Sequence, residues 1–266
     1  MARPLIELRG LEKRFGVHEV LRGVDLRIYK GEVLTLIGKS GGGKSVLIKH
    51  IVGLLKPDKG EIFYDGEPLS TMGRAKRREF KRRISYMFQS NALFDSMTVF
   101  ENIALPLVER LRLKRSEVRR RVMAKVEQLE LREVVDKYPS QISGGMQKRV
   151  ALARALIMEP EIVLFDEPTT GLDPLRKNAV LAMIAQYQKE FNFTAVVVSH
   201  DIPDVFFISN RVAILDGGRI IFEGSPMELE QMEDPVVEQF LHGEEALRDA
   251  LTGLNTRAEI EKRVRV

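Results

Sequence analysis

The sequence lacks cysteine and lacks any apolar run long enough to cross a membrane. None of its 266 residues is Cys, which excludes disulfides and metal sites built on thiolates. A membrane-spanning helix needs roughly 20 mostly apolar residues, and no stretch approaches that length. The first residues, Met1 to Glu7, have no signal-peptide core. We therefore expect a soluble protein that meets a membrane only through a partner.

The sequence also lacks a large excess of basic over acidic residues. The chain has 42 basic and 38 acidic residues, a formal net charge of +4, which does not by itself indicate a nucleic-acid partner. The segment 74–83 is a local exception, with seven basic residues in ten positions. We interpret it as a solvated helix face. The alternative, binding to a phosphate backbone, would need more than a run of charge.

What is present is the alternation of strands and helices that is typical of an α/β fold. The chain is 44% hydrophobic and long enough for one large core. Apolar runs predict strands over 5–11, 20–28, 33–37, 62–64, 84–88, 162–165, 194–198, 212–215 and 219–222. Helical patterns cover 46–52, 74–83, about 105–140, 150–158 and 180–190. Asp65-Gly66 is a hairpin turn signal. An apolar stripe in the long helical region, which includes Val118 and Val122, indicates packing.

A glycine-rich loop follows the predicted strand 33–37. It reads Gly38-Lys39-Ser40-Gly41-Gly42-Gly43-Lys44-Ser45 and fits the phosphate-binding pattern of Gly, four free positions, then Gly-Lys-Ser/Thr. Glycines let backbone N–H groups approach a triphosphate, and the following helix N-terminus favours anions. Lys44 is expected to neutralise the β- and γ-phosphates and the Ser45 hydroxyl to ligate Mg²⁺. A chance glycine-rich turn is the alternative.

Further polar residues stand at the ends of other predicted elements. Asp166 follows a buried strand and is expected to hold Mg²⁺ through water, and Glu167 could accept a proton from an attacking water. Ser143, with Gly144 and Gly145, forms a second candidate anion site at a helix N-terminus, although an ordinary helix cap is the alternative. Phe15 could stack on an adenine ring or could be a plain core residue.

In this order the motifs resemble those of an ATP-binding-cassette (ABC) ATPase subunit over roughly residues 5–240. Segment 38–45 matches the Walker A loop, Gln89 the Q-loop glutamine, Ser143 to Gln147 the signature, Phe165 to Pro168 Walker B, Gly171 to Asp173 the D-loop and His200 the switch histidine. The resemblance implies ATP and Mg²⁺ as cofactors. It also implies catalytic roles for Glu167, His200 and Gln89, and Mg²⁺ contacts from Ser45, Gln89 and Asp166.

The same resemblance implies an α/β P-loop NTPase fold, with a RecA-like core, an antiparallel β subdomain and an inserted helical subdomain. The ABC ATPase domain would span 1–240, its helical subdomain about 90–157. Two subunits would form a homodimer, with ATP between the Walker A loop of one and Ser143, Gly144 and Gly145 of the other. Asp173 would act across the dimer. Segment 241–266 resembles an extension that reaches onto the neighbouring subunit, and a frayed solvent helix is the alternative.

Two stretches resemble a narrower type. Met146 in the signature and the sequence from Phe88 to Asn102 are similar to MlaF-type ATPases of phospholipid-transport systems. That type implies an MlaE-type permease, an MCE-domain protein of the MlaD type and sometimes a STAS-domain protein of the MlaB type, at the cytoplasmic face of a bacterial inner membrane. Leu93, Phe94, Met97, Val99 and Phe100 would suit the permease contact. A transporter for another substrate, such as an amino acid, and a soluble ATPase acting on nucleic acid or ribosomes are alternatives, and no nucleic-acid partner is expected.

Overall fold

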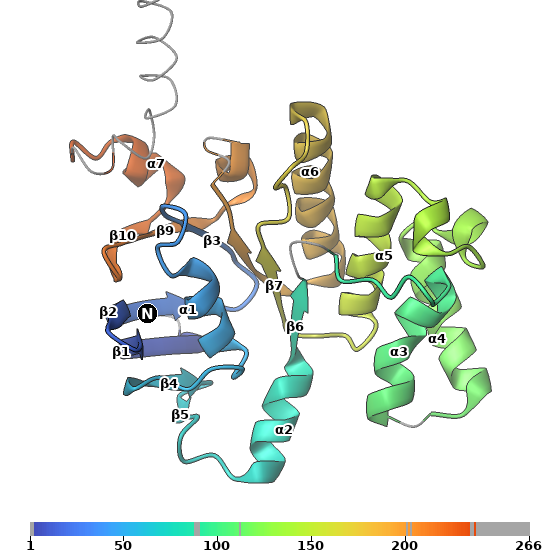
Figure 1. Ribbon diagram of the computed structural model, residues 1–266, viewed down its shortest axis with the longest axis horizontal. Coiled ribbons are helices and arrows are strands. Elements are labelled where there is room, and N and C mark those ends of the chain that lie inside the picture. Colours follow the sequence, from blue (N-terminus) through green and yellow to red (C-terminus); the bar gives the residue numbers. More distant parts are fainter. Residues whose placement is uncertain are drawn as a thin grey trace, which may run out of the picture.

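Two β-sheets and a group of helices organise the chain (Figure 1). The computed structural model describes residues 3–87, 91–111, 113–200, 202, 204–234 and 237. Gln89 and the segment 241–266 lie outside the described residues, so the predictions made for them are not addressed by the structure. In the described part of the chain, no helix combines the length and the apolar character that crossing a membrane requires.

The first sheet is antiparallel and formed by the N-terminal part of the chain. Its strand order is β2-β1-β4-β5, with bounds β1 (Ile6–Phe15), β2 (His18–Ile28), β4 (Lys59–Tyr64) and β5 (Glu67–Pro68). The predicted hairpin turn joins β4 to β5. Asp65 and Gly66 there have φ of 48° and 73°, as a tight hairpin turn requires. Residues along β2 alternate between buried and exposed, because one face of this sheet covers the core.

The second sheet contains the strands that carry the predicted polar residues. Its order is β10-β9-β3-β8-β7-β6, with bounds β3 (Val33–Ile37), β6 (Ile84–Met87), β7 (Ile162–Asp166), β8 (Thr194–Val198), β9 (Arg211–Asp216) and β10 (Arg219–Gly224). All its pairs are parallel except β9–β10. Leu34 and Leu36 pack into one core cluster, whereas Val33 and Ile37 pack into the other. Because both faces of β3 are covered, every residue in it is apolar or buried.

Helices cover both faces of the second sheet, and three of them form a separate group. The helices are α1 (Lys44–Ile51), α2 (Arg74–Arg83), α3 (Val99–Leu111), α4 (Arg115–Gln128), α5 (Gly144–Leu156), α6 (Pro174–Phe191) and α7 (Pro226–Glu230), with short 3-10 turns η1 (Arg132–Val134), η2 (Pro139–Gln141) and η3 (Asp204–Ile208). Helices α3, α4 and α5 lie together on the opposite side of β7 from α1 (Figure 1). Val118 and Val122 of α4 are buried, which confirms the packing interpretation of that stripe.

Two helices begin earlier than their sequence patterns predict. Helix α3 starts at Val99 and not near 105, because Thr98 and Glu101 form reciprocal capping hydrogen bonds. The buried Asn102 side chain then donates to the carbonyls of Phe94, Met97 and Thr98. Helix α6 starts at Pro174 and not near 180, because Asp173 caps it and proline suits the first helical position.

Candidate active site

The loop between β3 and α1 adopts a conformation that specific glycines permit. Gly43, the residue before α1, has φ of 97°, and a Cβ there would lie 2.9 Å from Val20 Cγ1. Gly41 has φ of 74°. Side chains other than glycine rarely adopt these angles. The first N–H groups of α1 have no acceptor within the helix, so the loop and helix together form an anion-binding cradle.

Gly38 is required for a reason that differs from the sequence interpretation. A Cβ at Gly38 would lie 2.3 Å from the carbonyl oxygen of Leu215 in β9. This glycine therefore allows the loop to leave β3 against the backbone of a neighbouring strand. The structure thus adds a packing requirement at Gly38, and the expected part of this glycine in phosphate binding stays a prediction. At Gly42, a Cβ would lie 2.9 Å from the carbonyl of Lys39, so the loop's own backbone also needs the space.

Lys44 lies beneath this loop. Its side chain is buried, and its ammonium donates to the carbonyl oxygens of Gly38 at 2.7 Å and Lys39 at 3.0 Å. Burial lowers the pKa of Lys44, whereas the nearby carboxylates of Glu167 and Asp166 raise it. The cation is thus held by the backbone of the loop that is expected to surround a phosphate.

A hydrogen-bonded set of oxygens lies beside Lys44. The Ser45 hydroxyl donates to Asp166 Oδ1 at 3.1 Å, and the Tyr86 hydroxyl donates to Asp166 Oδ2 at 2.5 Å. Burial, followed by the bond to the carboxylate, raises the pKa of Tyr86 well above its ordinary value. Hydroxyl and carboxylate oxygens are the ligands that Mg²⁺ prefers, usually together with water and substrate phosphates. The donor set of Ser45 and Asp166 therefore fits a Mg²⁺ bound with a nucleotide. No group of three or more His, Cys, Asp or Glu with metal-binding geometry occurs in the described ranges.

Glu167 and His200 come together at the carboxyl ends of β7 and β8. The Glu167 N–H donates to the carbonyl of Val198 at 3.0 Å, and its Oε2 lies 3.9 Å from His200 Nδ1. The Thr170 hydroxyl donates to the same carboxylate at 3.0 Å. Glu167 has φ of 50°. Strained backbone of this kind concentrates at functional sites, where surrounding contacts hold it.

Ser143, Gly144 and Gly145 form an exposed face at the start of α5. Ser143 caps the helix by accepting from the Met146 N–H at 3.3 Å. A Cβ added to either glycine would meet no atom within 4 Å. In Figure 1, α5 lies across β7 from α1, the helix that follows the loop 38–45.

The structure shows the local surroundings of Asp173 and Phe15. Asp173 caps α6 by accepting from the Arg176 N–H at 3.0 Å, and it pairs with the Arg176 side chain at 3.1 Å. The structure thus gives it a local capping role, and its action across a dimer stays a prediction. Phe15 is 49% exposed at the end of β1, so it is not a core residue, and stacking on adenine also stays a prediction.

Sequence reasoning missed two residues that support the site. Tyr86 could have been found, because β6 pairs in parallel with β7 and their carboxyl ends meet at one edge. The second is Lys148, a buried lysine of α5 that donates to the Pro168 carbonyl at 2.5 Å. It connects the helix that begins after Ser143 to the segment that follows Asp166. Lysine in a helical pattern gives no signal for such a contact.

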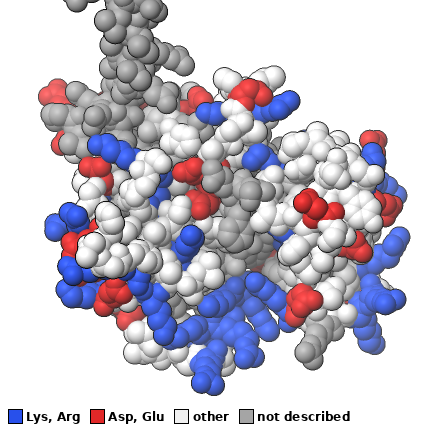
Figure 2. Space-filling view, viewed as in Figure 1, with Lys and Arg blue, Asp and Glu red and all other residues white. Residues whose placement is uncertain are grey.

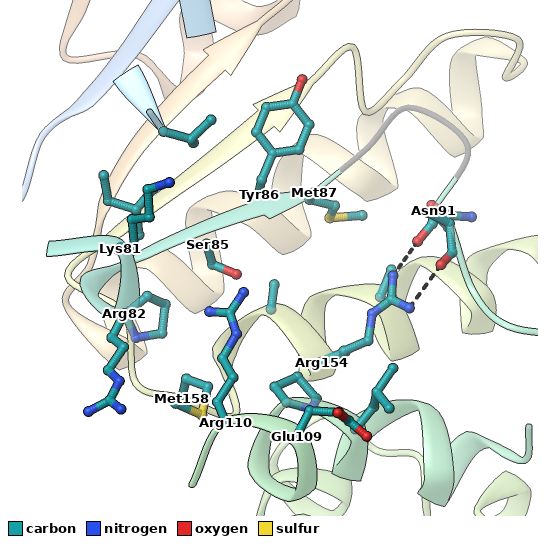
Figure 3. A pocket seen from close by; sticks show the side chains of 18 of the residues that line it. Lys81, Arg82, Ser85, Tyr86, Met87, Asn91, Glu109, Arg110, Arg154 and Met158 are labelled. Atoms are coloured by element: carbon teal, nitrogen blue, oxygen red, sulfur yellow. Dashed lines mark hydrogen bonds between the residues drawn. The ribbon is translucent and has the colours of Figure 1, made fainter. Parts of the chain in front are cut away.

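A groove of about 540 Å³ lies between β6, the end of α2, α3 and α5 (Figure 3). Apolar side chains that line it include Phe94, Leu105 and Met158, and basic ones include Lys81, Arg82 and Arg110. Arg154 of α5 crosses to the carbonyls of Asn91 and Ala92, at 2.8 Å each. Of the apolar residues expected to contact a permease, Phe94 lines the groove and is 49% exposed. Val99 is fully buried, and Leu93 and Phe100 pack against the core.

The chain is similar to known proteins in family, sequence and structure. A family model described as ABC transporter matches residues 21–170. The chain is 37% identical over 244 residues to the intermembrane phospholipid transport system ATP-binding protein MlaF of Haemophilus influenzae, and the alignment covers 92% of each chain. It is 41% identical over 224 residues to the Fe(3+) ions import ATP-binding protein FbpC of Escherichia coli O157:H7, covering 84% of this chain and 63% of FbpC.

One solved structure shares both the fold and the nucleotide chemistry. It is a dimeric ATP-binding cassette in a post-hydrolysis state, bound to ADP and Pi, with a TM-score of 0.71, 32% identity and coverage of 83% of this chain and 98% of that one. The ABC nucleotide-binding fold, with its antiparallel β subdomain and mixed parallel sheet, is therefore confirmed. With the loop 38–45 and the carboxylates of Asp166 and Glu167 assembled as described, the chain belongs to the ABC transporter family and is one of its ATP-hydrolysing subunits.

Proposed function

We propose that this ABC ATPase powers phospholipid transport between the inner and outer membranes of a bacterium. Its partners would be an MlaE-type permease, an MCE-domain protein of the MlaD type and, in some systems, a STAS-domain protein of the MlaB type. It would lie at the cytoplasmic face of the inner membrane through the permease. The observation that carries the proposal is the similarity to MlaF proteins over about nine-tenths of both chains, 92% of each for the Haemophilus influenzae protein.

A second candidate substrate class rests on another relative. FbpC, described as an ATP-binding protein for import of Fe(3+) ions, is 41% identical to this chain, and the match covers 63% of FbpC. Import of another substrate, such as an ion or an amino acid, is therefore the alternative on the same ATPase. The nucleotide-binding residues do not distinguish the two substrates, because the transported molecule is bound by the permease and not by the ATPase.

The proposed chemistry assigns each residue of the site a role. The loop 38–45 binds the phosphates of ATP through backbone N–H groups, and Lys44 neutralises their charge. Ser45 and Asp166, with Gln89, would hold Mg²⁺, which would supply positive charge to stabilise the phosphate oxygens. Glu167 accepts the proton of the attacking water, and His200 holds that water and the γ-phosphate in place. The 3.9 Å between Glu167 Oε2 and His200 Nδ1 supports their joint action on one water.

The complete site is proposed to need two chains. ABC ATPases dimerise and pair with permeases, and the relative with ADP and Pi is described as a dimer. Ser143, Gly144 and Gly145 would contact the nucleotide held by the loop of the other subunit, with Asp173 acting across the same seam. The exposure of this face and the open space above both glycines support that assignment. Phe15 would stack on the adenine.

The groove between β6, α3 and α5 is proposed to receive a cytoplasmic segment of the permease. A matched pair of substitutions tests it. Phe94 and Val108 are 49% and 50% exposed, but only the first is among the groove-lining residues described. Phe94→Glu should abolish co-purification of the permease from detergent-solubilised membranes, whereas Val108→Glu should preserve it. Recovery of ribosomes without a polytopic membrane protein would refute the transport function.

The substrate is tested in the purified complex. Reconstituted with its permease and MCE-domain protein, the ATPase should drive ATP-dependent movement of a labelled phospholipid to acceptor vesicles, and Glu167→Gln should stop it. The phospholipid assignment fails if the intact complex hydrolyses ATP without moving lipid while a soluble solute, such as an amino acid, stimulates hydrolysis.

A further inference from the structure

Helix α2 carries a row of basic side chains that the fold does not use. Seven of its ten residues are Lys or Arg. Three of them have partners. Lys76 pairs with Glu67 at 2.6 Å, Arg83 pairs with Glu79 at 2.6 Å, and Arg77 donates to the Leu69 carbonyl at 2.7 Å.

The remaining four basic residues have no hydrogen-bond or ion-pair partner among the residues the structure describes. They are Arg74, Arg78, Lys81 and Arg82, and all four are exposed. Their spacing of four, three and one residues places them along one face of the helix. We call these four residues the α2 stripe. It extends about 12 Å at 1.5 Å per residue, and Figure 2 shows the dense basic surface in the region where Figure 1 places α2.

The surface elsewhere neutralises much of its charge by pairing. On α4, for example, Glu117 pairs with both Arg120 and Arg121 at 2.7 Å. The formal net charge of the whole chain is +4, the same as the charge of the stripe. No carboxylate among the described residues pairs with the four cations of the stripe, and unpaired positive charge of this density indicates an anionic partner outside the chain.

The position of the stripe indicates which anionic partner it meets. Lys81 and Arg82 belong both to the stripe and to the wall of the groove (Figure 3). If an integral membrane permease occupies that groove, as proposed above, the same side of the ATPase is turned toward the bilayer. Adjacent to a membrane, a short row of exposed cations meets the phosphates of anionic lipid headgroups. Binding of single-stranded nucleic acid would favour exposed aromatic side chains for stacking, and Phe80, the aromatic residue of α2, is buried.

We propose that the α2 stripe binds the anionic lipid surface of the membrane, as a second contact beside the permease groove. This contact rests on the proposed function for its orientation, but it is a property of the ATPase alone. Each basic residue close to an anionic membrane strengthens binding by about fivefold. The stripe would hold the subunit against the bilayer and set its angle beneath the permease.

Vesicle co-sedimentation of the full-length ATPase tests the proposal. The protein should bind vesicles of phosphatidylcholine mixed with phosphatidylglycerol and not vesicles of phosphatidylcholine alone, and added salt should release it. The double variant Arg74→Gln/Arg78→Gln, at the two stripe residues that do not line the groove, should bind about 25-fold more weakly. Glutamine keeps helix propensity, so basal ATP hydrolysis and thermal unfolding should match those of the wild type.

A matched control lies on α4. Arg115 and Arg119 have the same four-residue spacing, are exposed and have no ion-pair partner in the described part of the chain. Arg115→Gln/Arg119→Gln removes the same charge and should leave vesicle binding unchanged. Equal losses in both variants would mean that net charge, and not the stripe, governs binding, and would overturn the proposal. Binding to neutral vesicles as tight as to anionic ones would overturn it as well.

Three further outcomes complete the test, and the last two separate this inference from the proposed function. A DNA duplex that binds more tightly per phosphate than the vesicles, and that the Arg74→Gln/Arg78→Gln variant no longer binds, would make the stripe a nucleic-acid surface and refute the lipid contact. If the permease co-purifies but anionic vesicles do not bind, the lipid contact fails while the transport function stands. If vesicles bind through the stripe but no permease is recovered, the transport function fails while the lipid contact stands.

Discussion

Replacing Gly145 by alanine separates folding from nucleotide contact at the start of α5. Gly145 is exposed inside the first turn of the helix, and an added Cβ meets no atom within 4 Å. Alanine is favoured over glycine in helices, so the variant should be as stable as the wild type or more stable by up to about 1 kcal/mol. If this face contacts the nucleotide held by a second subunit, the same methyl group stands between the helix and the phosphate.

The expected loss of activity follows from the contact that the methyl group displaces. A hydrogen bond to a charged group contributes about 1.5–3 kcal/mol, so hydrolysis should fall about ten- to a hundredfold. The assays are steady-state phosphate release, ATP-dependent dimerisation by light scattering, and thermal unfolding, where a gain of about 1 kcal/mol raises Tm by about 2–4 °C. Activity and stability should therefore change in opposite directions.

Gly73→Ala is the control. Gly73 precedes α2, far in sequence from the start of α5, and a Cβ there also meets nothing within 4 Å. It should keep full hydrolysis. If Gly145→Ala hydrolysed ATP and dimerised like the wild type, the α5 face would not contact nucleotide, and the two-chain site would be wrong. If Gly145→Ala instead unfolded well below the wild-type temperature, the geometry described for this turn would be wrong.

Three more substitutions test individual roles. Glu167→Gln should reduce hydrolysis by about 10²–10⁴-fold, as loss of a general base does, while ATP binding and the dimer persist; full turnover would exclude Glu167 as the base. Lys44→Ala should weaken nucleotide affinity in a fluorescent-ATP titration, and unchanged affinity would contradict its contact with phosphate. Tyr86→Phe removes a donor to Asp166, so the free energy of unfolding in denaturant should fall by about 1.5–3 kcal/mol and hydrolysis should need more Mg²⁺; if both stay the same, the bond from Tyr86 carries no function.

The parts of this molecule that sequence predicts well are those set by local pattern. Strands β3 and β8 were predicted at 33–37 and 194–198 and have those bounds, because apolar runs bounded by polar residues can be buried on both faces. The meeting of Ser45 and Asp166, at 3.1 Å, was also within reach. A phosphate loop and a carboxylate that follow parallel strands share one edge of the sheet.

The parts that sequence missed depend on atoms brought together from distant segments. The need for glycine at Gly38 comes from the Leu215 carbonyl, 177 residues further along the chain, which approaches where its Cβ would be. The basic run on α2 is visible in the sequence. Which of its residues stay unpaired is not, because the partners of Lys76 and Arg77 come from outside the helix. The early start of α3 is an exception. It could have been predicted from the sequence, because Thr98 and Glu101 have the spacing of a capping box.

Tyr86 has a consequence for how the transporter's two halves communicate. It lines the groove proposed for the permease, and its hydroxyl holds the carboxylate that also accepts from Ser45. A docked segment that displaces β6 would therefore act on the proposed Mg²⁺ ligands, Ser45 and Asp166, through a single side chain. By thermodynamic reciprocity, docking and Mg²⁺–nucleotide binding would change each other's affinity by the same factor. Permease affinity measured with and without Mg²⁺–ATP would thus report the coupling free energy between permease docking and nucleotide binding.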